Sequence, residues 1–136
     1  MLESAAVAYQ GFKSNSTGGP TPSVCPRVVS VCKPPSKLGL RAGQRIRLRY
    51  LIRAAAVRSA NDAATAIGIA ISGSEEAFAT RMNQTAAAMG MSNTTFRNAH
   101  GLTQSGHLST ARDMSVLGRH VIYDFPQYYN LFSRRT

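Results

Sequence analysis

Apolar positions in the middle of the chain recur with the period of α-helices. In the first such pattern Leu51, Ile52, Ala55 and Ala56 repeat at helical spacing, and the pattern stops near Ser59. A second pattern begins at Asn61 or Asp62 and ends at Gly73. Its apolar positions are Ala63, Ala66, Ile67, Ala70 and Ile71. Two helices are therefore expected to meet at a short Ser-Ala-Asn-Asp junction.

Further helices are predicted toward the C-terminus. Ser74 is expected to cap a third helix, with Glu75 and Glu76 in its first turn and Gly90 after its end. Its apolar stripe is Phe78, Met82 and Met89. The stretch TARD, residues 110–113, is typical of a capping box for a fourth helix. Its predicted buried face is Met114, Leu117, Val121 and Ile122, and Pro126 suits the first turn of a short final helix, QYYNLFS.

The remaining stretches lack helical periodicity. Residues 1–35 are rich in Gly, Pro, Ser and Thr and predict a disordered or loop segment. Arg45 to Leu48 alternates polar and apolar residues, as a short extended segment does. The stretch MSNTTFRNAHGLTQSGH predicts turns and extended segments. The sequence thus predicts one mostly α-helical domain from residue 36 to 136.

Charge raises the question of an anionic partner. The chain of 136 residues carries 16 Lys and Arg against 6 acids, a formal net charge of +10. Arg45, Arg47, Arg49 and Arg53 cluster, but the later arginines are scattered singly, and no RNA- or DNA-binding signature accompanies them. No specific nucleic-acid partner is expected. A non-catalytic, basic helical module that binds an anionic partner is kept as the alternative function.

Other polar residues have ordinary explanations. Six residues lie between Cys25 and Cys32, which is no zinc spacing, and the two are either incidental thiols or a small disulfide loop. The three histidines, for which solvent or turn chemistry is expected, have no carboxylate at ligand spacing, so neither a metal site nor a cofactor is expected: His100, His107 and His120. The sequence shows no signal peptide and no apolar stretch long enough to span a membrane.

The junction SANDA has two interpretations. In the first, Asn61 or Asp62 simply caps the second helix, because short polar side chains accept hydrogen bonds from the first N–H groups of a helix. Alternatively, Ser59-Ala60-Asn61 is the Ser-x-Asn motif of serine acyl-transferring enzymes. There, a serine relays a proton to the leaving group, and an amide two residues on holds a lysine and the substrate's carbonyl. A tight connection between two helices lets both residues face one cleft.

The longer pattern resembles the D-alanyl-D-alanine carboxypeptidases, the low-molecular-mass penicillin-binding proteins. The matching stretches come in family order: KLGLRAGQRIRLRYLI, SANDA, GSEEAF, MN, MGM, NTTFRNAHGL, GH-STARDM and DFPQYY. The resemblance covers about residues 34–136. It implies the serine β-lactamase/transpeptidase fold, an α/β fold in which a helical subdomain lies beside an antiparallel sheet. The matched part is the helical subdomain, with the sheet part largely absent.

The resemblance also implies a mechanism and a substrate. In the family, a Ser-x-x-Lys serine forms an acyl-enzyme with a peptidoglycan peptide ending in D-Ala-D-Ala, and the lysine is the general base. A Lys-Thr-Gly strand binds the terminal carboxylate and completes the oxyanion site. Ser59 matches the proton-relaying serine and Asn61 the motif asparagine. β-Lactams are expected to bind an intact homologue, and the expected location is the periplasm or cell envelope.

The sequence departs from the family pattern in four places. Its one literal Ser-x-x-Lys, Ser30 to Lys33, is followed at once by two prolines, which no helix could continue through, so we interpret it as a chance match and identify no nucleophile. No Lys-Thr-Gly follows Asn61. Ala60 replaces the commoner glycine, and Arg49 stands where the motif helix should be capped. We therefore expect a truncated or frameshifted chain that is inactive alone.

Overall fold

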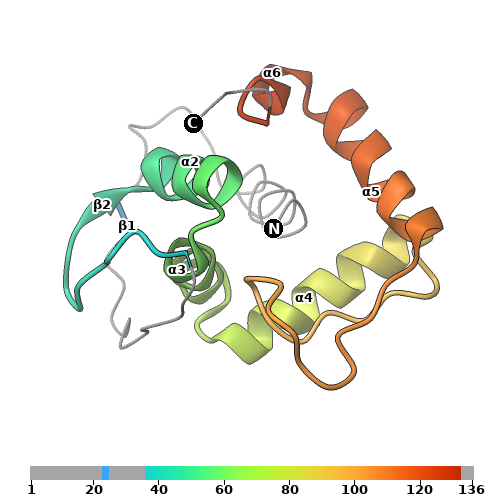
Figure 1. Cartoon of the computed structure of the whole chain (residues 1–136), viewed down its shortest axis with the longest axis horizontal. Helices are drawn as coiled ribbons and strands as arrows, with labels where there is room; N and C mark the ends of the chain where they lie inside the picture. The colour runs from blue at the N-terminus through green and yellow to red at the C-terminus, as the bar shows by residue number, and fades with distance from the viewer. Residues whose placement is uncertain (1–22, 25–35, 133–136) are drawn as a thin grey trace.

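The computed structural model describes residues 23–24 and 36–132, and this part of the chain is mostly helical. The prediction of a helical subdomain is confirmed. In the view of Figure 1, α2 and α3 lie at the left, α4 along the bottom and α5 at the right. The elements are β1 (Ser23–Val24), β2 (Ile46–Arg47), α2 (Leu48–Arg58), α3 (Asn61–Ser72), α4 (Glu75–Ala88), α5 (Ala111–Asp124) and α6 (Pro126–Tyr129).

Strand β2 leads directly into α2. It pairs antiparallel with β1, so that Ser23 lies opposite Arg47 and Val24 opposite Ile46. The two residues of β1 belong to the segment 1–35, whose other residues lie outside those described. Helix α2 begins at Leu48, so its N-cap is Arg47 and not Arg49, and the side chain of Arg47 makes no capping hydrogen bond. The start of α2 therefore depends on packing, because its N-terminal N–H groups receive no side-chain acceptor.

Small side chains bring the first three helices together. Helix α3 packs against both α2 and α4. Ala63, Ala66 and Ile67 are fully buried, as predicted, whereas Ala70 is exposed. Alanine lets helix backbones approach closely, and larger side chains then fill the space between them. The large residues of this core include Leu51, Ile67, Phe78 and Met82.

The predicted serine and threonine caps are present. Ser74 Oγ accepts a 3.1 Å hydrogen bond from the N–H of Ala77, and Thr110 Oγ1 accepts one of 3.1 Å from the N–H of Asp113. The Asp113 carboxylate, however, accepts from the N–H of Asn93 at 2.8 Å and from the Thr94 hydroxyl at 2.6 Å. It therefore ties the start of α5 to the preceding turn, in addition to marking the helix start.

The buried face of α5 and the end of α6 differ from the prediction. Leu117 and Val121 of α5 are buried, and Met114 is half-buried, but Ile122 is 40% exposed. The buried stripe is narrower than predicted, because residue 122 lies about 100° round the helix from residue 121. The final helix stops at Tyr129, and turns follow to residue 132.

Turns connect α4 to α5, as predicted. One isolated bridge joins Thr95 and Leu108. The Asn83 side chain of α4 holds the backbone of Phe96, accepting from its N–H at 2.7 Å and donating to its carbonyl at 2.9 Å.

Among the described residues, no helix is both long enough and apolar enough to cross a lipid bilayer.

The close approach of α3 to α4 makes Gly68 a sensitive position. A Cβ atom added there would lie 2.7 Å from Cδ1 of Phe78, whose side chain is fully buried. Gly68→Ala should therefore lower the free energy of unfolding by about 1–3 kcal/mol, measured by urea denaturation. Gly118→Ala on α5 is the matched control, since an added Cβ meets nothing within 4 Å. It should be neutral or stabilise by about 0.5–1 kcal/mol. Equal effects at the two positions would contradict this packing.

Candidate active site

The connection between α2 and α3 consists of Ser59 and Ala60 alone. Ser59 has φ +54° and ψ +37°, and among the described residues it is the one non-glycine residue with a positive φ. Its N–H and that of Ala60 both donate to the carbonyl of Ala54, the latter at 3.2 Å. Such a backbone conformation costs a non-glycine residue energy and is enriched at functional sites. It also leaves the Ser59 side chain exposed.

Ala60 and Asn61 are buried beside the exposed serine. Ala60 has φ −72°, which any residue can adopt, and is 1% exposed. The commoner glycine is therefore not needed for the backbone at this position. Asn61 is the first residue of α3 and is 3% exposed, and its N–H donates to the carbonyl of Ser36 at 3.0 Å. The three motif residues are thus held by the core on one side and open to solvent at Ser59.

Ser36 supports the junction from a distant part of the chain. Besides accepting from Asn61, it donates from its hydroxyl to the carbonyl of Arg58 at 2.6 Å. These two bonds bracket Ser59 and Ala60, so Ser36 helps to fix the path of the chain between the helices. No pattern in the sequence points to Ser36, because a serine in a polar, Pro-rich stretch looks like any other loop residue.

Asp62 anchors the segment that follows Ser36. Its Oδ1 accepts from the N–H of Leu38 at 2.8 Å, and its Oδ2 accepts from Gly39 at 2.8 Å and Leu40 at 3.1 Å. Oδ1 also accepts from the next residue in α3, Ala63, at 2.9 Å. Burial by itself would raise the pKa of the Asp62 carboxyl, but these four backbone donors outweigh it and lower the pKa below its ordinary value.

The interpretation of Asn61 or Asp62 as a helix cap is wrong. The N-cap of α3 is Ala60, whose side chain cannot accept a hydrogen bond. Asn61 and Asp62 lie inside the first turn, where an acidic residue still benefits from the helix dipole. The Asp62 carboxylate mainly receives donors from another segment, which sequence patterns within α3 could not show.

A polar cluster lies farther along α3. Thr65 is one turn after Asn61, so the two residues share a face of the helix. The Glu75 Oε1 atom lies 3.4 Å from Thr65 Oγ1, 3.3 Å from the N–H nitrogen of Ala99 and 3.4 Å from Nε2 of His100. His100 is 7% exposed, so it is no solvent histidine, but its Nδ1 accepts from the N–H of Leu102 at 3.2 Å, which is the turn chemistry expected as the alternative. Glu75 thus joins α3, α4 and the turn at residue 100.

The other histidines make local contacts. His107 Nδ1 accepts from the N–H of Arg97 at 3.2 Å, and His120 pairs with Asp124 one turn away on α5 at 2.6 Å. Within the described ranges, no three His, Cys, Asp or Glu side chains gather as metal ligands would. Ser30, Lys33 and both cysteines lie outside the described residues.

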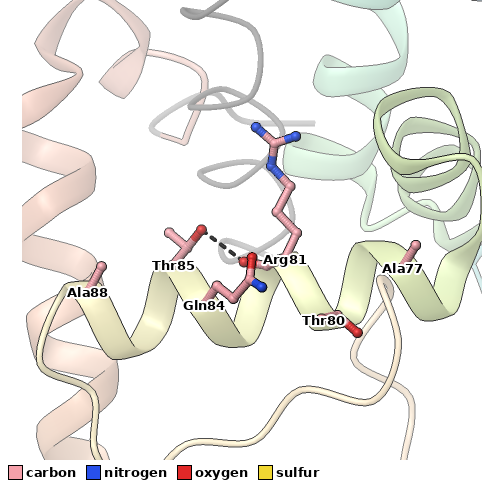
Figure 2. A pocket seen from close by; sticks show the side chains of 6 residues that line it. All are labelled: Ala77, Thr80, Arg81, Gln84, Thr85 and Ala88. Atoms are coloured by element: carbon pink, nitrogen blue, oxygen red, sulfur yellow. Dashed lines mark hydrogen bonds between the residues drawn. The ribbon is translucent and has the colours of Figure 1, made fainter.

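A hollow of about 710 Å³ lies along one face of α4 and not at the junction between α2 and α3. Figure 2 shows the six residues that line it, which include Arg81, Gln84 and Thr85, with Thr85 donating to the carbonyl of Arg81 at 3.0 Å. None of its lining residues belongs to the junction between α2 and α3. The candidate site therefore rests on the geometry of Ser59 and Asn61.

Comparisons with known proteins identify the class. The family model described as D-alanyl-D-alanine carboxypeptidase matches residues 22–136, starting earlier than residue 34. D-alanyl-D-alanine carboxypeptidase DacC of Escherichia coli is 37% identical over 100 residues, which are 74% of this chain and 25% of that protein. The chain spans about a quarter of the length of such curated relatives.

Solved structures agree with the sequence comparison. Penicillin-binding protein 5 of Haemophilus influenzae matches with a TM-score of 0.85 and 30% identity, over 98% of this chain and 40% of that one. Penicillin-binding protein D2 of Listeria monocytogenes, solved with bound cefotaxime, matches with a TM-score of 0.80 and 26% identity, over 98% of this chain and 54% of that one. The fold is thus that of the serine penicillin-binding proteins. This chain belongs to their D-alanyl-D-alanine carboxypeptidase family and corresponds to part of the length of its relatives.

The strained backbone of Ser59 predicts an unusual mutational effect. Ser59→Gly removes the side chain that opposes a left-handed conformation and should stabilise the chain by about 0.5–1 kcal/mol in urea unfolding. Ser59→Ala keeps the strain and should stay within about 0.5 kcal/mol of the native chain. If Ser59→Gly is instead destabilising, the hydroxyl contributes to folding, and the strain does not point to function.

The lowered pKa of Asp62 predicts how stability depends on pH. A carboxyl whose pKa is lower in the folded state contributes stability above its unfolded pKa of about 3.9, and this contribution is lost as the pH falls through the folded value. Asp62→Asn should therefore cost about 1–3 kcal/mol at pH 7 and clearly less at pH 3, in urea unfolding at both pH values.

Two other aspartates serve as comparisons for the pH dependence of Asp62→Asn. The pKa of Asp113 is also lowered, chiefly by the Thr94 hydroxyl against the opposing effect of burial, so the native chain should lose stability below about pH 4 even without Asp62. Asp124→Asn is the matched control, since Asp124 is exposed and should change stability by at most about 0.5 kcal/mol at pH 7. A cost of Asp62→Asn that is the same at both pH values would show that its charge is not responsible.

Proposed function

We propose that this chain supplies the side of a serine D-Ala-D-Ala carboxypeptidase active site that carries the Ser-x-Asn motif. Ser59 is the proton-relaying serine, and Asn61 is the amide that holds the catalytic lysine and the substrate's carbonyl. The observation that carries the proposal is the left-handed, exposed Ser59 between two packed helices, two residues before a buried Asn61. Family membership supports the assignment, because the match extends on both sides of this motif.

The proposed reaction follows from the family. A serine nucleophile attacks the carbonyl of the penultimate D-Ala in a peptidoglycan peptide and expels the terminal D-Ala, and water then hydrolyses the acyl-enzyme. The leaving amine needs a proton, which a hydroxyl such as that of Ser59 can pass on. The Ser59 side chain is exposed, which makes its hydroxyl accessible to such a substrate. The place of action would be the periplasm or cell envelope, where this substrate lies.

In this proposal, the nucleophile and the carboxylate-binding strand come from outside residues 36–136. We retain the interpretation of Ser30 and Lys33 as a chance match, and the sequence contains no Lys-Thr-Gly. Residues 36–136 therefore form a partial catalytic domain in this proposal, and the chain alone is inactive. β-Lactams, which mimic the D-Ala-D-Ala end, would acylate an intact homologue and not this chain.

A fluorescent penicillin tests both parts of the proposal. The chain alone should retain no label after denaturation. Label that survives denaturation and disappears in a Ser30→Ala variant would make Ser30 the nucleophile and overturn the inactive assignment.

The positive arm of the same assay uses a chimera. Residues 36–132 of this chain replace the matching segment of Escherichia coli DacC, and the chimera should be acylated. Ser59→Ala should slow acylation by about a hundredfold or more, as expected for loss of a proton-transfer group. Ser92→Ala, an exposed serine in the turn after α4, is the matched control and should have no effect. An acylated chimera that is indifferent to Ser59→Ala would refute the role of Ser59.

A further inference from the structure

Four exposed arginines follow one another closely along the chain, just before and within β2 and in the first half of α2. Arg45 and Arg47 flank the half-buried Ile46, so their side chains lie on the same side of the extended segment. Arg49 and Arg53 are four residues apart and share one face of α2. All four arginines are exposed, whereas the opposite face of α2 belongs to the core. We call these four residues the arginine row.

Among the described residues, no acidic side chain pairs with the arginine row. Between Glu3 and Asp62 the sequence contains no Asp or Glu, and Asp62 is 1% exposed and occupied by backbone N–H groups. In residues 23–24 and 36–132, the ion pairs are those of two histidines, and none includes an arginine of the row. A surface that is merely solvated normally intersperses both signs of charge. Within this part of the chain, the positive charge of the row has no acidic partner.

One aromatic side chain lies beside the row. Tyr50 is 50% exposed, and the guanidinium carbon of Arg49 lies 5.5 Å from the centroid of its ring. Tyrosine is favoured at the boundary between water and lipid, because its ring is apolar and its hydroxyl polar. The guanidinium group binds phosphate with two parallel hydrogen bonds.

We propose that the arginine row, with Tyr50, binds the surface of an anionic phospholipid bilayer. The arginines would bind lipid phosphates, and the ring of Tyr50 would enter the boundary between headgroups and acyl chains. A nucleic acid also offers phosphates, but its backbone gives the Tyr50 ring no apolar layer to enter. This surface acts independently of Ser59 and Asn61, so binding is expected whether or not the chain takes part in catalysis.

Vesicle co-sedimentation of the full chain tests the proposal. The chain should bind vesicles of phosphatidylglycerol and phosphatidylcholine but not vesicles of phosphatidylcholine alone, and binding should weaken with added salt. Arg49→Gln with Arg53→Gln should reduce the binding constant by about tenfold or more. Arg112→Gln with Arg119→Gln on α5 is the matched control: both arginines are exposed, and the same charge is removed. The control should lose about twofold at most.

Further variants separate the competing explanations. Arg45→Gln with Arg47→Gln should also lower vesicle binding, and thermal melts of each variant establish that it is folded. Tyr50→Ser should weaken binding to vesicles while leaving binding to a duplex oligonucleotide unchanged. Equal losses in the α2 and α5 pairs would mean that only total charge matters, which overturns the proposal. The proposal is also overturned if the chain binds the oligonucleotide but not the vesicles, or if it binds neither.

Discussion

The arrangement of the site depends on one carboxylate that organises a distant stretch of backbone. Asp62, in the first turn of α3, accepts hydrogen bonds from three successive N–H groups at residues 38–40. A charge this deeply buried is tolerated only when it is fully hydrogen-bonded, and here the donors are main-chain groups that also need partners. The same contact brings Ser36 against the junction, where it binds Arg58 and Asn61. The short connection between α2 and α3 is thus held from the outside as well as by its helices.

Strain at this connection falls on the residue with the proposed chemical role. Ser59 adopts the left-handed conformation, whereas Ala60 does not, so the alanine found in place of the commoner glycine is structurally harmless. The methyl group of Ala60 is buried, which adds to the core beneath the exposed serine. Natural proteins retain such strain where a side chain must point in a particular direction, and the rest of the structure compensates for it. The strained residue is thus the one to which the proposal assigns a chemical role.

The described part of the chain has two chemically distinct faces on neighbouring elements. The junction of α2 and α3 presents one strained hydroxyl above a buried amide, whereas β2 and the start of α2 present a row of arginines. The row begins on the extended segment and continues on the helix because exposed positions alternate in a strand and recur every three to four residues in a helix. Arg45, Arg47, Arg49 and Arg53 follow this change of period at Leu48, so all four are exposed although they lie on two kinds of element.

Periodicity and local chemistry alone determined most of the helices of this protein. The apolar repeats, the caps at Ser74 and Thr110 and the stop at Gly73 are properties of neighbouring residues, and the structure has them where the sequence predicts them. The Ser-x-Asn motif was visible too, once set beside the family pattern. Only the tertiary structure decided that Ser59 is left-handed, that Asp62 binds the backbone at residues 38–40, and that Glu75 lies beside a buried His100. The physical reason is that these contacts join residues 22 to 25 positions apart, and no local propensity encodes which distant donor a buried carboxylate will meet.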